Sequence, residues 1–258
     1  VQFQKLGLDS VGEEDLIFFS AQKISIVQPK IGIYRNKLLP DSYSEKPMYS
    51  SLLRESPINI QIDSLQLKDA QFTYVERSKW ENEGGKLEFN KMNVDITRLG
   101  NTYKDDTQVR LTTLFMDSAP FEGTWSFNVL DPNDVFTFEG ELHGLALNEL
   151  NAFTQPYADT RLEGIMQDVY FNIYGNGETS TVDLKCKFND VSIFLLKPGT
   201  RKKKKLLSAL ANVLVSTNSK HKGEDFKQVS VNVQRDKTKS SWNYIFKNIE
   251  EGMKKVLL

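Results

Sequence analysis

The chain is poor in the residue types that most often build metal and redox sites. Cys186 is the one cysteine, so no internal disulfide is possible, and His143 and His221 are the two histidines. The sequence has no Cys-x-x-Cys, His-Glu-x-x-His, Gly-x-Ser-x-Gly or glycine-rich phosphate-binding pattern. We therefore expect a protein that is not an enzyme and that has no cofactor and no metal site.

Long apolar runs and a large net charge are missing as well. No stretch approaches the roughly 20 apolar residues that cross a bilayer as a helix. Lysine plus arginine number 33 and aspartate plus glutamate 34, for a formal net charge of -1, so no overall charge draws the chain to nucleic acid. An alternating pattern already begins at Val1 and Phe3, which indicates that an N-terminal segment, with any anchor or export signal, is missing upstream.

The chain is rich in alternating apolar and polar residues, the pattern of strands with one buried face. With 39% apolar and 26% charged residues, its 258 residues suit a folded body with a large core. Clear alternating stretches are 58–62, 109–115, 121–129, 136–142, 182–188 and 229–233. Turn signals such as Gly84-Gly85 and Asn176-Gly177 separate such stretches. Because parallel neighbours need long crossovers, this short spacing predicts an antiparallel meander.

A few segments have helical periodicity instead. Residues 48–56 and 147–155 are short, and each is expected to stop before a proline, Pro57 or Pro156. Residues 204–215 and 240–258 carry apolar residues at helical spacing, and Ser240 or Ser241 can cap the last helix. Helices this few do not cover the sheet as in an α/β protein.

The one-sided strands leave two solutions for their apolar face. Either two sheets close into a sandwich, or one sheet curls into a barrel or trough whose interior is apolar. Adjacent residues of a strand face opposite sides, so Phe127 is expected to point inward and Asn128 outward.

Two groups of residues resemble chemical sites at first sight. Glu139, Glu141 and His143 share one strand face at i, i+2 and i+4, as three metal ligands would. The apolar residues between them take the inward face, so the pattern favours a solvated outer face. Cys186 alternates with apolar residues, which indicates a core thiol rather than a reactive one.

A basic run opens the helix expected at 204–215. It consists of Arg201, Lys202, Lys203, Lys204 and Lys205. The run suits a solvated linker, and it also suits a contact with anionic lipid headgroups, which gains about 1 kcal/mol per charge near a negative surface. A nucleic-acid site is disfavoured because aromatic residues are not interleaved with the basic ones.

Several stretches, in order, resemble one known family. The best are "KKKKLLSALANVLV" at 202–215 and "VNVQRDKTKSSWNYIFKNIEEGMKKV" at 231–256. The others are 21–40, 51–77, 84–99 and 129–176. On these stretches the chain resembles, over nearly its whole length, the AsmA-like proteins of the Bacteroidetes type, relatives of the repeating-β-groove lipid transporters.

The resemblance implies a mainly β fold, a long antiparallel meander curled into a trough or half-barrel with an apolar groove. A few short helices, including a C-terminal amphipathic helix, would accompany it. A single AsmA-like β-groove domain would cover 1–258, with N-terminal strands and a short helix at 1–56. A central antiparallel sheet would follow at 57–200, and C-terminal helices and a strand at 201–258.

For function, the resemblance implies a non-enzymatic envelope protein that binds or transfers lipid and supports outer-membrane biogenesis. The protein would lie on the periplasmic side of the cell envelope, anchored to a membrane through the missing segment. Its partners would be phospholipid or another acyl-chain lipid, the inner or outer membrane and envelope assembly proteins, but not nucleic acid.

The expected lipid groove is lined by inward-facing apolar residues of the strands. They are Ile58, Ile60, Ile62, Leu111, Phe121, Trp125, Phe127, Phe136, Phe138, Val169, Phe171 and Leu184. The basic run 201–205 is the expected contact with the membrane surface.

The alternative function is a structural scaffold subunit of an outer-membrane or periplasmic assembly complex, without lipid transfer. In that case the trough is filled by the protein's own side chains and helices. Large inward residues suit both alternatives, so the sequence leaves them open.

Overall fold

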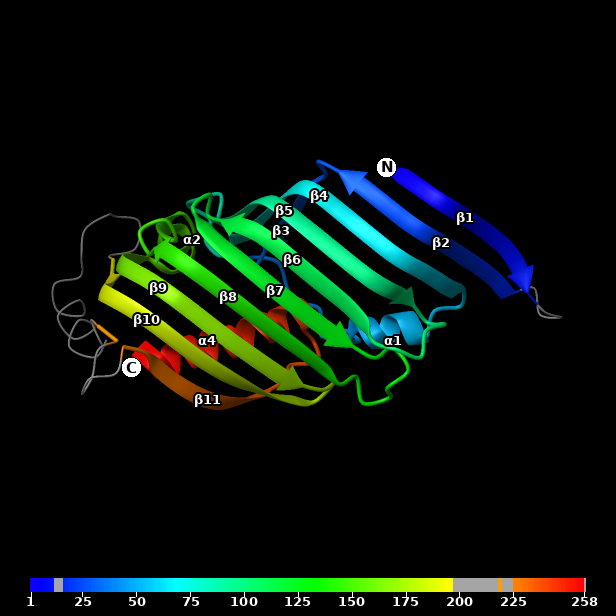
Figure 1. The fold of residues 1–258 in the computed structure, drawn as a ribbon. Helices are drawn as coiled ribbons and strands as arrows, with labels where there is room; N and C mark the ends of the chain where they lie inside the picture. The colour runs from blue at the N-terminus through cyan, green and yellow to red at the C-terminus, as the bar shows by residue number, and fades with distance from the viewer. Residues whose placement is uncertain (12–15, 197–217, 220–224, 258) are drawn as a thin grey trace.

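The computed structural model describes residues 1–11, 16–196, 218–219 and 225–257 (Figure 1). The fold is mainly β, with 59% strand and one long mixed sheet of 11 strands that does not close into a barrel. Within the described residues three short helices, one of them C-terminal, accompany the sheet. The predicted fold class is confirmed, with a single curved sheet instead of a sandwich.

The strands follow the chain almost in order across the sheet. They are β1 (Gln2–Val11), β2 (Leu16–Val27), β3 (Lys30–Asn36), β4 (Asn59–Arg77), β5 (Gly85–Gly100), β6 (Thr107–Phe115), β7 (Ala119–Phe127), β8 (Phe136–Ala146), β9 (Thr160–Gly175), β10 (Thr179–Leu195) and β11 (Lys227–Gln234). Their order is β1-β2-β4-β5-β6-β7-β8-β9-β10-β11, and β3 also pairs with β4. From β4 to β11 every neighbouring pair is antiparallel, as predicted for the meander.

The N-terminal strands depart from the antiparallel meander. β2 and β3 both run parallel to β4. They form one interrupted strand, because the Gln28 N–H donates to the Lys68 carbonyl (2.8 Å) and the Gln71 N–H donates to the Pro29 carbonyl (2.9 Å). The connection 37–58 is long enough to bring the chain back to the end of the sheet where β2 began. The antiparallel expectation therefore does not extend to this crossover.

The helices lie near their predicted positions. They are α1 (Tyr49–Arg54), α2 (Asn151–Ala158) and α4 (Ser241–Leu257). Ser240 caps α4 as predicted, since its Oγ accepts a hydrogen bond from the Asn243 N–H (3.3 Å). The helix expected at 204–215 lies outside the described residues.

α2 does not stop before its proline. Pro156 lies inside the helix, which ends at Asp159 in a left-handed conformation (φ 47°). The last turn is held from outside, because the Asn82 amide donates to the Pro156 carbonyl (3.0 Å) and the Ser78 hydroxyl donates to the Tyr157 carbonyl (2.7 Å). These tertiary hydrogen bonds override the local preference of the residue before a proline.

Single left-handed residues shift the alternation inside several strands. Lys5, Asp69, Lys91, Arg98 and Asp190 have φ between 47° and 55°. Apolar residues flank each of them at a spacing of three instead of two, namely Phe3 and Leu6, Leu67 and Ala70, Phe89 and Met92, Ile96 and Leu99, and Phe188 and Val191. A left-handed residue turns the pleat over, so the apolar side chains on both sides of it stay on one face; at Asp69, Lys91 and Asp190 the pairing register also shifts, as in a β-bulge.

The buried core is divided unequally between two halves of the sheet. The larger core lies on β6–β11 and includes residues of α1 and α4. The smaller core has Ala21, Ile24 and Ile62 as its buried residues and lies on β2, β4 and β5. We call β6–β11 the covered half, because α4 contacts β9, β10 and β11, and β1–β5 the uncovered half. In Figure 1, α4 lies behind the strands of the covered half, and β1 and β2 lie far from it.

Candidate functional site

A row of apolar side chains crosses ten strands of the sheet. In strand order the row is Phe3, Ile24, Leu65, Ile96, Val109, Trp125, Phe138, Ile173, Val182 and Val231, each directly opposite the next. Directly opposite residues of neighbouring strands point to the same face. The row therefore defines one continuous apolar face, which we call the inner face.

In the covered half the helix α4 packs on this face. Trp125, Phe138, Ile173 and Val182 are at most 6% exposed. α4 contributes Ile245 and other apolar residues to the same core. Here the trough contains the protein's own side chains.

α4 has a second apolar side that is not buried. Its buried residues are Ser241, Tyr244, Ile245, Asn248, Gly252 and Val256. Trp242 and Phe246, part of the apolar stripe seen in the sequence, are 38% and 51% exposed. The centroids of the Trp242 ring and the Trp125 ring of β7 are 5.5 Å apart. Phe246 is four residues after Trp242 and so lies on the same side of the helix. This side of α4 therefore faces away from the edge strand β11.

In the uncovered half the inner face stays accessible. Phe3, Leu6 and Leu8 of β1 are 51%, 54% and 71% exposed. Ile31 and Ile33 of β3 are 39% and 46% exposed, and they lie opposite Phe72 and Tyr74 of β4. Burying one large apolar side chain gains about 1.5–3 kcal/mol, so a contiguous apolar area of this kind is a candidate binding surface.

The residues predicted to line a groove share the inner face but differ in exposure. Eight of them are buried, namely Ile62, Trp125, Phe127, Phe136, Phe138, Val169, Phe171 and Leu184. The other four are half-buried, namely Ile58, Ile60, Leu111 and Phe121. The predicted membrane contact, Arg201–Lys205, lies outside the described residues.

Sequence reasoning missed the most exposed part of the inner face. It did not propose Phe3, Leu6, Ile31 or Ile33 as lining residues. The alternation in β1 and β3 was a usable signal, but a strand pattern does not say which part of a face a helix covers.

α1 and α2 hold the curved sheet at opposite ends of its strands. At one end, the hydroxyls of Ser50 and Ser51 and the guanidinium of Arg54 donate to the buried Asp134 carboxylate (2.6–3.0 Å). At the other end, α2 packs against β4 and β5 as well as β9, and Lys79 forms an ion pair with Asp159 (2.7 Å). These contacts tie connections on opposite sides of the sheet together and so stabilise its curvature.

His143 and Cys186 are described residues that could carry catalytic chemistry. His143 Nδ1 lies 2.8 Å from Asp168 Oδ1, and its Nε2 lies 3.9 Å from Glu141. No group of three or more metal-binding side chains occurs among the described residues. Cys186 is fully buried, and burial raises the pKa of its thiol to about 12 although Lys227 acts in the opposite direction. That thiol stays protonated at neutral pH.

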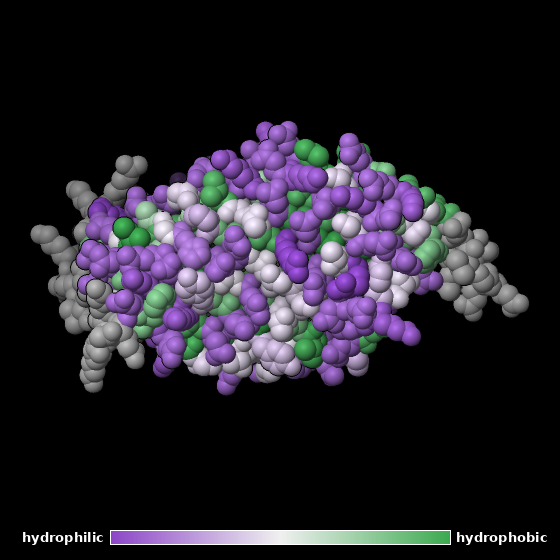
Figure 2. Space-filling view, viewed as in Figure 1, coloured by the Kyte–Doolittle hydropathy of each residue, from purple (hydrophilic) through white to green (hydrophobic). Residues whose placement is uncertain are grey.

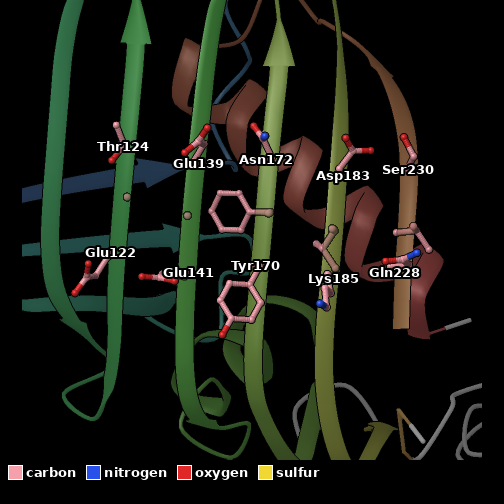
Figure 3. Close-up of a pocket in the computed structure, with 15 residues that line it drawn as sticks. Glu122, Thr124, Glu139, Glu141, Tyr170, Asn172, Asp183, Lys185, Gln228 and Ser230 are labelled. Carbon is pink, nitrogen blue, oxygen red and sulfur yellow. The ribbon is translucent and has the colours of Figure 1, made fainter. Parts of the chain in front are cut away.

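The face opposite the inner face, here the outer face, is mainly hydrophilic (Figure 2). A hollow of about 830 Å³ lies on it across β7–β11 (Figure 3). Two ladders of directly opposite polar residues cross the hollow. The first ladder is Thr124, Glu139, Asn172, Asp183 and Ser230, and the second is Glu122, Glu141, Tyr170, Lys185 and Gln228.

No helix in the described part of the chain is long and apolar enough to span a membrane. Comparison with models of protein families, with curated proteins and with solved structures finds no match for this chain.

Proposed function

We propose that the chain is a non-enzymatic lipid-binding or lipid-transfer module. Acyl chains lie on the inner face of the uncovered half, between β1–β5 and the exposed side of α4. The observation that carries the proposal is the continuous apolar row, which is covered by α4 at one end and accessible at the other.

The chemistry of this surface suits an acyl chain. The row from Phe3 to Ile96 presents hydrocarbon side chains, and a lipid tail needs apolar contact without hydrogen bonds. Each methylene removed from water gains about 0.8 kcal/mol, so a tail that is only partly enclosed is still held. A surface of this kind does not select one tail over another, which suits transfer better than specific recognition.

The cellular setting follows from the family resemblance alone. It consists of the periplasmic side of the envelope, a membrane anchor outside this chain and a contribution to outer-membrane biogenesis. Under this proposal the basic run 201–205 contacts anionic headgroups, and the partners are phospholipid, the inner or outer membrane and envelope assembly proteins.

The scaffold alternative is favoured by the covered half. There α4 and α1 fill the trough so completely that residues such as Ile173 and Val182 are 0% exposed. If a protein partner covers the uncovered half in the same way, the module is a structural subunit and carries no lipid.

Native mass spectrometry with lipid extraction, on the purified chain, tests the proposal. Leu65→Asp places a carboxylate in the middle of the inner row, whereas Ser64→Asp places one on the outer face opposite Lys23. We expect phospholipid on the wild type and on Ser64→Asp, and little on Leu65→Asp. Circular dichroism confirms that both variants are folded.

Two results contradict lipid binding. One is a wild type that carries no lipid after incubation with phosphatidylethanolamine and phosphatidylglycerol vesicles. The other is equal lipid loading of Leu65→Asp and Ser64→Asp. Either result leaves the scaffold function as the better account of the apolar face.

A further inference from the structure

The hollow on the outer face has the volume of a ligand site. Its volume of about 830 Å³ falls within the range of about 300–1,000 Å³ that small-molecule sites occupy. It spans β7 to β11, and four spacings of about 4.8 Å make it roughly 19 Å wide across the strands. It lies on the face opposite α4, so it is separate from the apolar surface of the proposed function (Figure 3).

Most polar side chains of the hollow have no side-chain partner within the described part of the chain. Seven of the ten form no side-chain hydrogen bond and no ion pair there, namely Glu122, Thr124, Glu139, Asn172, Asp183, Gln228 and Ser230. Some other residues of the outer face are paired, as in Thr181 with Asn232 (2.8 Å) and Gln66 with Asp95 (2.6 Å). The donors and acceptors of these seven side chains are therefore available to a ligand in the hollow.

The charges in the hollow exclude some ligands. Four carboxylates face one ammonium, that of Lys185, so a phosphate or another anion is repelled. Glu122 lies directly opposite Glu141, an arrangement that destabilises a sheet unless a donor bridges the two carboxylates. Lys185 lies in the same ladder and weakens the attraction for a cation.

One aromatic ring is held in place within this polar lining. The Tyr170 and His143 rings meet in a T-shaped contact with their centroids 5.7 Å apart, and the centroid of the Phe226 ring lies 6.2 Å from that of Tyr170. His143 is itself hydrogen-bonded to Asp168 (2.8 Å). A side chain fixed by its neighbours in this way loses little entropy when a ligand packs against it.

We propose that this hollow binds a neutral oligosaccharide. Vicinal hydroxyls donate to the unpaired carboxylates and accept from the amides of Asn172 and Gln228 and from Lys185. A sugar ring packs against Tyr170, and a chain of a few rings fits across the five strands that line the hollow. Two vicinal hydroxyls, one donating to Glu122 and one to Glu141, satisfy both carboxylates without a metal.

Isothermal titration calorimetry of the full chain tests the proposal. The probes are maltohexaose, cellohexaose, chitohexaose and mannohexaose, with deca-lysine as a cationic competitor. Tyr170→Ala removes the ring from the hollow, and Asn172→Ala removes an unpaired amide. Tyr174→Ala is the matched control, since Tyr174 is on the same strand and face but outside the hollow and is 63% exposed.

We expect at least one hexasaccharide to bind the wild type. Tyr170→Ala and Asn172→Ala should each weaken that binding about tenfold, and Tyr174→Ala should change it less than about twofold. Unchanged thermal unfolding of the variants shows that the loss is local. The proposal fails if no hexasaccharide binds, if the two tyrosine variants lose affinity equally, or if deca-lysine binds more tightly than every sugar.

Discussion

Val182 and Phe3 lie in the same apolar row at the two ends of one sheet, yet Val182 is 0% exposed and Phe3 is 51% exposed. The strands that carry them have the same alternating pattern. What differs is the layer above them, since α4 packs on β9–β11 and no described helix packs on β1 or β2 in the same way. The comparison shows that an inward-facing residue is a core residue only where a second layer reaches it.

Thiol reactivity offers the largest expected contrast between the halves. Cys186 of the covered half has its pKa raised to about 12 and is fully buried, so it should react with a disulfide reagent only when the sheet opens. A thiol at Leu6→Cys, in a Cys186→Ala background, should react about a thousandfold faster or more. The measurement is the rate of absorbance change with Ellman's reagent under native conditions.

This experiment also sharpens the comparison. Phospholipid vesicles should slow the reaction at position 6 if acyl chains cover the inner face there, and should leave Cys186 unaffected. If the two thiols react with Ellman's reagent at similar rates, the covered half exposes its core as readily as the uncovered half, and the difference in burial between the halves is contradicted.

A buried carboxyl should have the next largest effect. Val182→Asp places an unpaired carboxyl in the core and should lower the free energy of unfolding by at least about 3 kcal/mol. Leu65→Asp, in the same row but half-buried, should cost about 1 kcal/mol. Thr181→Asp, next to Val182 and facing outward beside Asn232, should change stability by less than about 0.5 kcal/mol. Urea unfolding followed by fluorescence measures all three.

The adjacent pair Phe127 and Asn128 is less suitable for this test. Phe127 points inward and is 5% exposed, as its register predicts. The Asn128 amide, however, donates to the Asp106 carboxylate (3.1 Å), so Asn128→Asp would bring two carboxylates together.

For the pair Val182→Asp and Leu65→Asp, an equal decrease in the free energy of unfolding would contradict the conclusion that α4 covers only one half of the inner face.

A methyl group added to glycine should have the smallest effect. A Cβ on Gly140 of β8 would lie 2.3 Å from Cζ of the Phe171 ring, whereas nothing lies within 4 Å of a Cβ on Gly32 of β3. Gly140→Ala should therefore cost about 1–3 kcal/mol through overpacking. Gly32→Ala should be neutral or slightly stabilising, because alanine is less flexible than glycine in the unfolded chain. Thermal unfolding compares them, and a neutral Gly140→Ala would mean that the ring of Phe171 moves aside easily.

Much of the fold was predictable because alternation is a local property. Val1, Phe3, Leu6 and Leu8 already show the shift in phase at Lys5 that the structure realises as a left-handed residue. The C-terminal helix was equally clear from its apolar spacing and its serine cap. The limit of such patterns appears at Pro156, where hydrogen bonds from Asn82 and Ser78 keep α2 going past the point at which the local rule ends it.

The candidate sites were less predictable. The outer hollow joins side chains from five strands, and no single stretch of the sequence marks it as different from any solvated strand face. Glu139 and Glu141 were noticed with His143 as possible metal ligands. The structure pairs His143 with Asp168 instead and leaves Glu139 with Asn172 and Thr124 as its cross-strand neighbours.

By itself the sequence determined that this chain forms one-sided strands, since period-two alternation has one stable solution, a sheet with an apolar face. It also determined where most strands turn and where the last helix begins. Only the tertiary structure decided that β2 and β3 run parallel to β4, that α4 fills the trough over β9–β11, and that Phe3 and Leu6 stay accessible. These outcomes depend on which elements far apart in the sequence pack together, and the alternation within a strand does not predict which element packs on its apolar face.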